Sequence, residues 1–453
     1  MPPKKTQIYI LIIVAVLIFI SAGIILIVEK NKAVSADSDV KTTASDATKD
    51  QTSSESQTQT TQQGSESTSG VLQPTGSTSS TKKPVSTKPH AQKPVTPNHP
   101  APKPNPNPKP LPPSPPSVSH ENIKGVWISY LEIAGYKNLG QSQFTTKMEN
   151  CLNYAKSRGL NTVIVQVRSH GDAIYPSAYY PWSKYITTSG SLSYDPLSII
   201  VSLAHSKGIS VHAWINPFRV MTDSEFQKIP SSYPTKQWYS SSSRDSYMIQ
   251  KDSRWYLKPG NAEVRELIFN GVGELVSKYD IDAIHIDDYF YATSPSNYGD
   301  SSAQAKQNNT ALVRGIYQKV KSIKPKVLFG ISPAGSFKAG SVLPTSDTGY
   351  LSTNLKLWCN NAGYIDYVMP QIYWKHGHST QDFTRVLGQW RSFVKSPSVA
   401  LYTGLAVYKE SSSETSDPFP KGEIASQINE IQSSGMSSGY CLFRYDFINQ
   451  VSF

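Results

Sequence analysis

From residue 123 onward the chain alternates eight short apolar runs with longer amphipathic segments, and this alternation limits its fold more than any other feature. The runs, each typical of a buried strand, cover 125–130, 162–168, 209–215, 282–287, 326–332, 365–372, 398–405 and 439–445. The amphipathic segments predict helices over 142–158, 196–207, 262–279, 301–323, 351–361, 379–395 and 421–434. Because eight strands alternating with helices favour closure, we expect an α/β fold, a (β/α)8 TIM barrel. A doubly wound sheet is the alternative.

Local signals agree with several of these boundaries. Asp195 before Pro196 is a typical helix start, and Gly159 and Gly208 follow two of the expected helices. The segment 216–261 is too long for a plain loop, so we expect it to form inserted structure over the barrel mouth. Few residues follow the last strand, so the eighth helix is expected to be short or missing.

The first part of the chain has a composition that does not support a folded core. Residues 33–120 contain no Phe, Trp or Tyr, whereas all eight tryptophans come later. Such a segment cannot bury enough apolar surface to offset the entropy lost on ordering. We therefore expect a disordered linker over 31–120, Ser/Thr-rich at first and then an extended Pro-rich spacer, before one domain over 121–453.

Residues 8–28 form an uncharged apolar run. Its 21 residues would span roughly 30 Å as a helix, which is one bilayer core. We predict an N-terminal transmembrane anchor over 1–30, with a cleaved secretory signal as the alternative. Both interpretations export the rest of the chain. The expected location is the cell membrane, single-pass with the C-terminal domain outside, or the secreted fraction if the segment is cleaved.

Charge and cysteine content exclude several classes of function. The net charge of +11 is spread along the chain, and no basic cluster is interleaved with aromatic residues, so we expect no nucleic-acid partner. No Walker or Rossmann glycine pattern occurs. Cys151, Cys359 and Cys441 form no metal-binding pair, which predicts buried thiols, or one bridge and one free thiol. We expect no cofactor, no metal and a monomer.

Polar and aromatic residues gather at the carboxyl ends of the expected strands, where barrel enzymes carry their chemistry. Alternation along the strand 282–287 points Asp287 into the barrel mouth, and Asp288 would begin the loop, outward or across the rim. These two are the catalytic candidates. The substrate-binding candidates are Arg168, Asp172, Trp214, Asn216, Arg219, His285, Tyr289, Gln371, Tyr373 and Trp374.

A carboxylate ringed by aromatic, amide and guanidinium groups is a typical sugar-site composition. Glycoside hydrolysis needs two carboxyl groups, a proton donor and a nucleophile or base. Asp287 suits the second role, while a structural ion pair with Arg168 or Arg219 is the alternative. The proton donor stays open among strand-end carboxyl groups: Asp288, Asp172, Glu132 and Asp446.

Some of the candidates also fit a purely structural interpretation. His285 lies one pleat deeper than Asp287, where a histidine usually belongs to the core. His170 is expected on the solvated rim. Trp127, Trp214 and Trp374 also suit a core, although at least one is expected to face ligand.

Several of these stretches together resemble the glycosyl-hydrolase-like family ten. They are GVWISYLE (125–132), IVQVRSHGDAIYPSAYYPWS (164–183), AHSKGISVHAWINPFRV (204–220), LKPG (257–260), YDIDAIHIDDYFY (279–291), KVLFGISPAG (326–335) and IDYVMPQIYWKHG (365–377). The resemblance runs from about residue 124 to 445. It implies a (β/α)8 barrel, glycoside hydrolase activity centred on Asp287-Asp288-Tyr289, and an extracytoplasmic envelope protein.

The residues and the resemblance together predict a membrane-tethered glycoside hydrolase that acts on a cell-envelope polysaccharide, such as the glycan strands of peptidoglycan. The alternative is a non-catalytic glycan-binding barrel of the cell wall. A carbohydrate deacetylase is disfavoured, because that chemistry usually needs a metal set of Asp and His.

Overall fold

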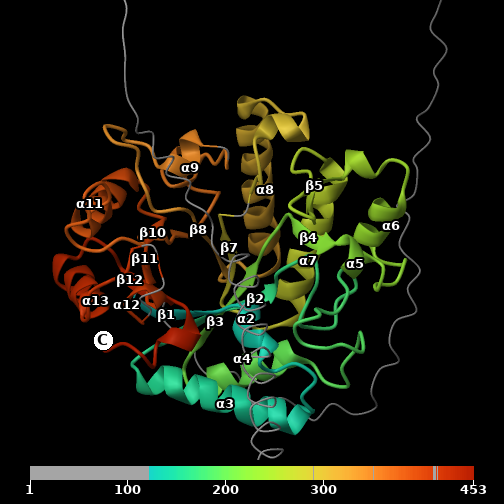
Figure 1. Ribbon diagram of the computed structural model, residues 1–453, viewed down its shortest axis with the longest axis horizontal. Helices are drawn as coiled ribbons and strands as arrows, with labels where there is room; N and C mark the ends of the chain where they lie inside the picture. Colours follow the sequence, from blue (N-terminus) through green and yellow to red (C-terminus); the bar gives the residue numbers. More distant parts are fainter. Residues whose placement is uncertain (1–121, 289, 350, 412–414, 416) are drawn as a thin grey trace, which may run out of the picture. The chain divides into compact units, whose positions relative to one another are not determined.

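The computed structural model describes residues 122–288, 290–349, 351–411, 415 and 417–453 (Figure 1). The predicted anchor over 1–30 and the predicted linker over 31–120 lie outside the described residues. Within the described part of the chain, no helix combines the length and the apolar character needed to cross a membrane.

The described residues form a parallel sheet that closes almost completely into a TIM-barrel-like sheet (Figure 1). In sheet order its strands are β10 (Ala400–Leu401), β9 (Tyr367–Val368), β8 (Leu328–Ser332), β7 (Ala283–Asp287), β3 (Ser210–Ile215), β2 (Thr162–Arg168), β1 (Ile123–Ile128), β12 (Gly439–Phe443) and β11 (Thr403–Ala406). β10 pairs with β9 and β11 pairs with β12, so the two ends of the sheet are parts of one predicted strand. The strand pattern and the α/β class are therefore confirmed.

The predicted strand over 365–372 is too long. Only Tyr367–Val368 forms β9, because Pro370 has no N–H to continue the ladder. Beyond β9, single hydrogen bonds connect the chain to Gly404 of β11. Gly404 N donates to Pro370 O at 2.9 Å, and Ile372 N donates to Gly404 O at 3.0 Å. The backbone beyond β9 therefore stays bonded to its neighbours as far as Ile372 and enters the loop after that residue.

Helices surround the sheet (Figure 1). They are α2 (Tyr130–Ala134), α3 (Gln141–Ser157), α4 (Pro196–Ser206), α7 (Ala262–Lys278), α8 (Ser302–Ile323), α11 (Phe383–Phe393), α12 (Tyr408–Ser411) and α13 (Glu423–Ser434), with a 3-10 turn η2 (Pro295–Tyr298) before α8. Asp195 begins α4 as predicted, and its carboxylate accepts from Leu197 N at 3.0 Å. After β12 the described chain forms only the short turn η3 (Tyr445–Phe447), in agreement with the predicted loss of the eighth helix.

The predicted helix over 351–361 is too long, since only residues 355–358 of it are helical. Two short helices, α9 (Thr345–Thr348) and α10 (Leu355–Trp358), flank a loop in which Ser352 has a φ of 52°. The buried carboxylate of Asp347 accepts from Leu355 N at 2.7 Å and Lys356 N at 3.1 Å. It therefore starts α10 four residues later than the pattern indicates.

The insert predicted over 216–261 has structure of its own. It contains β4 (Arg219–Thr222), α5 (Asp223–Phe226), α6 (Pro234–Ser240), the turn η1 (Arg244–Ser246), β5 (Met248–Lys251) and β6 (Arg254–Leu257), with the strands in the antiparallel order β4-β6-β5. The insert packs against the loop after β2. Gly171 there has a φ of 65°, and a Cβ on it would lie 2.5 Å from Val220 Cγ1. Only glycine allows this close approach.

Alternation along the strands divides the core. One buried cluster includes Trp127, Ile164, Trp214, Tyr367 and Cys441, and the larger one joins the strands to the surrounding helices. Cys151, Cys359 and Cys441 are all buried and unbridged, so the buried-thiol prediction is confirmed and the disulfide alternative is not.

Candidate active site

Asp287 and Asp288 lie at the carboxyl end of β7, and each is only 6% exposed. Asn216 immediately follows the neighbouring strand β3. Its Nδ2 donates to Asp287 Oδ1 at 2.6 Å. The structure thus brings these candidates together although they are 71 residues apart in the chain.

A polar chain orients the Asn216 amide. Its Oδ1 accepts from Gln166 Nε2 and, at 3.1 Å, from Arg219 Nη2. Gln166 Oε1 in turn accepts from Tyr130 N at 2.9 Å. Because Asn216 Oδ1 is occupied by two donors, its N–H group must face Asp287. The candidates did not include Gln166, although it shares the face of β2 that also carries the buried Ile164.

Asp288 is buried, which excludes the outward one of its two expected orientations. The chain turns sharply at this point, with Phe290 N donating to Asp288 O at 2.9 Å. Burial and then the negative charge of Asp287 raise the pKa of Asp288 to about 7, although Arg219 acts in the opposite direction. Near neutral pH the Asp288 carboxyl group can therefore still hold a proton, which is what a general acid needs.

Tyr373 and Gln371 follow β9 and reach the same end of the barrel. Burial raises the pKa of Tyr373 well above its ordinary value, and nearby charges, first that of Tyr408 and last those of Asp288 and Asp287, act in the same direction. Gln371 Nε2 donates to Ser332 O at 3.0 Å, and Ser332 pairs with Asp287 in the sheet. Trp374 is half-buried beside them.

The structure does not place Arg168 in this site. The register between β2 and β3 shifts between Gln166 and Arg168, which turns the arginine away from the barrel interior. Its guanidinium lies 4.5 Å from the ring centroid of Tyr180, and its Nη2 donates to Pro217 O at 2.8 Å. Tyr180 itself donates to Leu267 O of α7 at 3.2 Å, so Arg168 belongs to the layer between sheet and helix.

We therefore expect Arg168→Ala to lower the free energy of unfolding by about 2–4 kcal/mol, since it removes a packed stem and a buried cation–π contact. Denaturant titration measures this loss. The KM for a glycan substrate should stay within about twofold of the wild-type value. If Arg168→Ala left the stability unchanged and raised the KM tenfold, Arg168 would be a substrate-binding residue after all.

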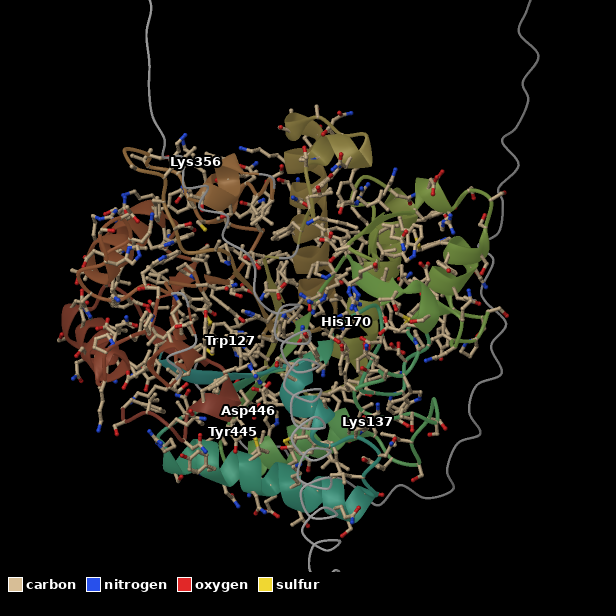
Figure 2. All side chains as sticks on the ribbon, in the orientation of Figure 1. Trp127, Lys137, His170, Lys356, Tyr445 and Asp446 are labelled. Carbon is tan, nitrogen blue, oxygen red and sulfur yellow. The ribbon has the colours of Figure 1, made fainter. Side chains whose placement is uncertain are left out.

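His285 and Trp214 are core residues here, which agrees with their structural interpretation. His285 Nδ1 lies 2.9 Å from Tyr367 Oη, and its Nε2 lies 3.0 Å from Ser332 Oγ. Burial lowers the pKa of His285 well below its ordinary value, so it stays neutral. Trp214 packs in the same buried cluster as Trp127. Trp127 is labelled in Figure 2.

The other carboxyl candidates are engaged elsewhere. Asp172 Oδ1 accepts from His170 N at 2.8 Å and Ser169 N at 3.2 Å, which closes the loop after β2. Glu132 Oε1 lies 2.6 Å from Arg444 Nη1, and burial raises the pKa of Glu132. Asp446 is exposed and lies beside Tyr445, on the side of the barrel that α3 covers (Figure 2).

His170 is not on a solvated rim, because it is only 2% exposed. Its ring lies edge-on to Tyr130 at 5.0 Å, and its pKa is lowered by burial and then by Arg219. Tyr289 lies outside the described residues. Among the residues that the structure describes, no group of three or more His, Cys, Asp or Glu side chains could hold a metal ion.

The chain is similar in sequence to several known proteins. Residues 122–419 match the family described as Glycosyl hydrolase-like 10. Glycosyl hydrolase DigH of Escherichia coli (strain K12) is 32% identical over 384 residues, which cover 75% of this chain and 86% of DigH. Glycosyl hydrolase YngK of Bacillus subtilis (strain 168) is 33% identical over 321 residues, which cover 64% of this chain but only 62% of YngK. The glycoside hydrolase domain of PgaB (BpsB) from Bordetella bronchiseptica superposes with a TM-score of 0.49 at 11% identity, over 72% of this chain and 95% of that domain.

Proposed function

This chain belongs to the Glycosyl hydrolase-like 10 family, and we propose that it hydrolyses the glycosidic bonds of a cell-envelope polysaccharide. One observation carries the proposal. Two adjacent carboxyl groups, Asp287 and Asp288, are buried at the carboxyl end of a barrel strand, and one of them has a pKa of about 7. A pair whose members differ in their hold on a proton supplies both the acid and the base of the reaction.

In the proposed mechanism, protonated Asp288 donates its proton to the glycosidic oxygen as the bond to the leaving sugar breaks. Asp287 stays ionised and acts on the other reactant, as nucleophile or as base toward water. The N–H of Asn216, 2.6 Å away, holds the Asp287 carboxylate in one orientation. Tyr373, Gln371 and Trp374 would contact sugar at the mouth.

The choice of substrate rests on the first part of the chain. The apolar run 8–28 and the long Pro-rich segment that follows it suit a domain held outside the membrane within the wall. We therefore propose a single-pass membrane protein that acts on wall glycan, with the glycan strands of peptidoglycan as the first candidate. Degradation of the domain by protease added to intact cells tests this placement.

Incubation of the purified full-length chain with purified glycan strands tests the activity directly. Mass spectrometry of the products should show new shorter fragments with a reducing end at each cleaved bond. Binding without any cleavage would instead favour a non-catalytic glycan-binding barrel.

A further inference from the structure

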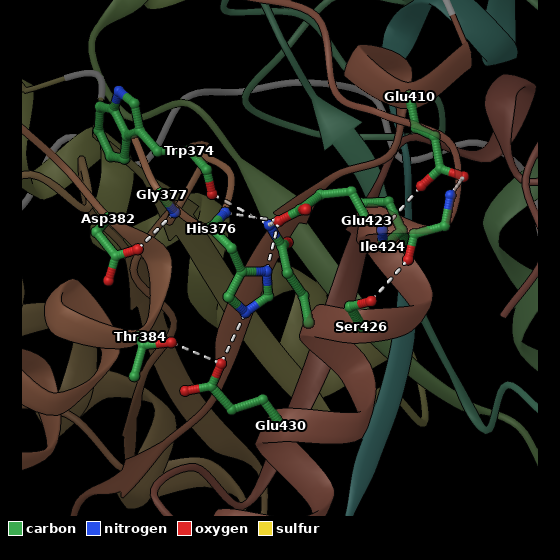
Figure 3. A network of polar contacts seen from close by, with 12 residues as sticks. Trp374, His376, Gly377, Asp382, Thr384, Glu410, Glu423, Ile424, Ser426 and Glu430 are labelled. Atoms are coloured by element: carbon green, nitrogen blue, oxygen red, sulfur yellow. Dashed lines mark hydrogen bonds and ion pairs between the residues drawn. The ribbon is translucent and has the colours of Figure 1, made fainter. Parts of the chain in front are cut away.

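His376 lies in the loop after β9, three residues beyond Tyr373, and its ring meets α13 (Figure 3). Its Nδ1 is 2.8 Å from Glu423 Oε1, and its Nε2 is 2.8 Å from Glu430 Oε2. The main-chain N of His376 also donates to Glu423 Oε1 at 2.8 Å. The residue is thus held at three points by one helix.

This geometry defines the protonation state of the ring. An ionised carboxylate only accepts hydrogen bonds, so two carboxylates facing the two ring nitrogens require a proton on each nitrogen. His376 is therefore an imidazolium in this arrangement. Burial lowers its pKa, but the hydrogen bonds and charges of Glu430 and Glu423 outweigh burial, so the pKa is raised overall.

The same network holds the main chain of Trp374, and a separate lysine holds that of Tyr373. Gln427 Nε2 donates to Glu423 Oε1 at 2.8 Å and to Trp374 O at 3.1 Å. Lys409 Nζ donates to Tyr373 O at 2.9 Å. Figure 3 shows the indole of Trp374 lying apart from this network, which holds the residue only by its main-chain oxygen.

Other charged groups surround the histidine without replacing its contacts. Asp382, at the start of α11, accepts from Gly377 N at 2.7 Å, and the positive charge of His376 helps to lower the pKa of Asp382, which burial opposes. Within the loop, Lys375 pairs with Asp417 at 3.0 Å. His378 lies 4.0 Å from the same carboxylate. If His376 lost its positive charge, the carboxylates of Glu423, Glu430 and Asp382 would lose the cation that they face.

We propose that His376 is a positioning residue for substrate, which clamps the loop 373–377 to α13 and so places Tyr373 and Trp374 for sugar binding. This inference rests on the proposed glycan hydrolysis for its kinetic consequence. Its structural consequence does not depend on activity.

The clamp depends on pH in a defined direction. A histidine whose pKa is raised in the folded chain keeps its interactions at acid pH and loses them as pH rises through the raised pKa. The KM for glycan should therefore rise on the alkaline side, while the chemical step follows the carboxyl pair.

The test compares His376→Gln with wild type in the full-length chain. Hydrogen exchange of the peptide 371–378 should be faster in the variant than in wild type. The exchange rate of wild type should approach that of the variant only at alkaline pH. The KM of the variant should be about tenfold higher, as expected for one lost charge-assisted hydrogen bond, and should no longer change with pH.

His378→Gln is the matched control. His378 lies just after the loop 373–377, and its Nδ1 accepts from Thr380 N at 3.3 Å and Gln381 N at 3.0 Å rather than from carboxylates of α13, so both readouts should stay unchanged. Unaltered exchange in His376→Gln, or a KM that still rises with pH as in wild type, would overturn the clamp. If wild type hydrolyses no glycan, the proposed function fails, and the exchange measurement still decides the clamp.

Discussion

Asp287→Asn is expected to lower kcat for glycan hydrolysis by about 10³-fold, because asparagine can act neither as nucleophile nor as base. The change keeps the size of the side chain and an oxygen able to accept from Asn216 Nδ2. The fold and the sugar-binding residues should therefore stay in place. Initial rates on glycan strands, with thermal unfolding of the same sample, separate lost chemistry from lost structure.

Asp282 offers a matched control just before the opposite end of the same strand. Its carboxylate lies 2.9 Å from His205 Nε2 and accepts from Val211 N at 2.7 Å. Asp282→Asn should weaken these contacts and lower the unfolding temperature while kcat stays close to wild type. Full activity in Asp287→Asn would remove Asp287 from the mechanism.

Asp288→Asn should lower kcat by about 10²–10³-fold on natural glycans, because no group remains to protonate the leaving oxygen. Since the pKa of Asp288 is raised to about 7, kcat/KM of wild type should fall as pH rises above that value. In an aryl glycoside a phenolate takes the place of the leaving sugar and departs without protonation. Such a substrate should restore most of the rate of Asp288→Asn but not that of Asp287→Asn. Equal loss on both substrates would contradict the acid role.

The same raised pKa also predicts that the stability of the wild-type protein depends on pH. Between about pH 4 and pH 7 the unfolded carboxyl group loses its proton while the folded one keeps it, so wild-type stability falls across this range. Asp288→Asn does not titrate. Its unfolding temperature relative to wild type should therefore rise from pH 4 to pH 7, and a constant difference would argue against the raised pKa.

Much of the architecture could be predicted from local pattern, and the exceptions have physical causes. The strand-end rule and alternation put Asp287 and Asn216 at the same end of the barrel, where the structure has them. Alternation gave the wrong face of the strand for Arg168. The register between β2 and β3 shifts by one residue before Arg168, so its side chain points away from the barrel interior. It also could not show that Asp288 is buried, since that burial depends on contacts beyond the strand.

The sequence by itself determined the alternating strands and helices, the insert and the strand-end carboxylates. All of these depend on neighbouring residues and on their periodicity. Only the tertiary structure decided which polar groups form hydrogen bonds with one another. Asn216 and Asp287 are 71 residues apart, and His376 and Glu423 are 47 apart, so each contact depends on how the closed sheet and its helices bring distant segments together. Burial in that assembly, rather than residue type, separates Asp288 from the exposed Asp446.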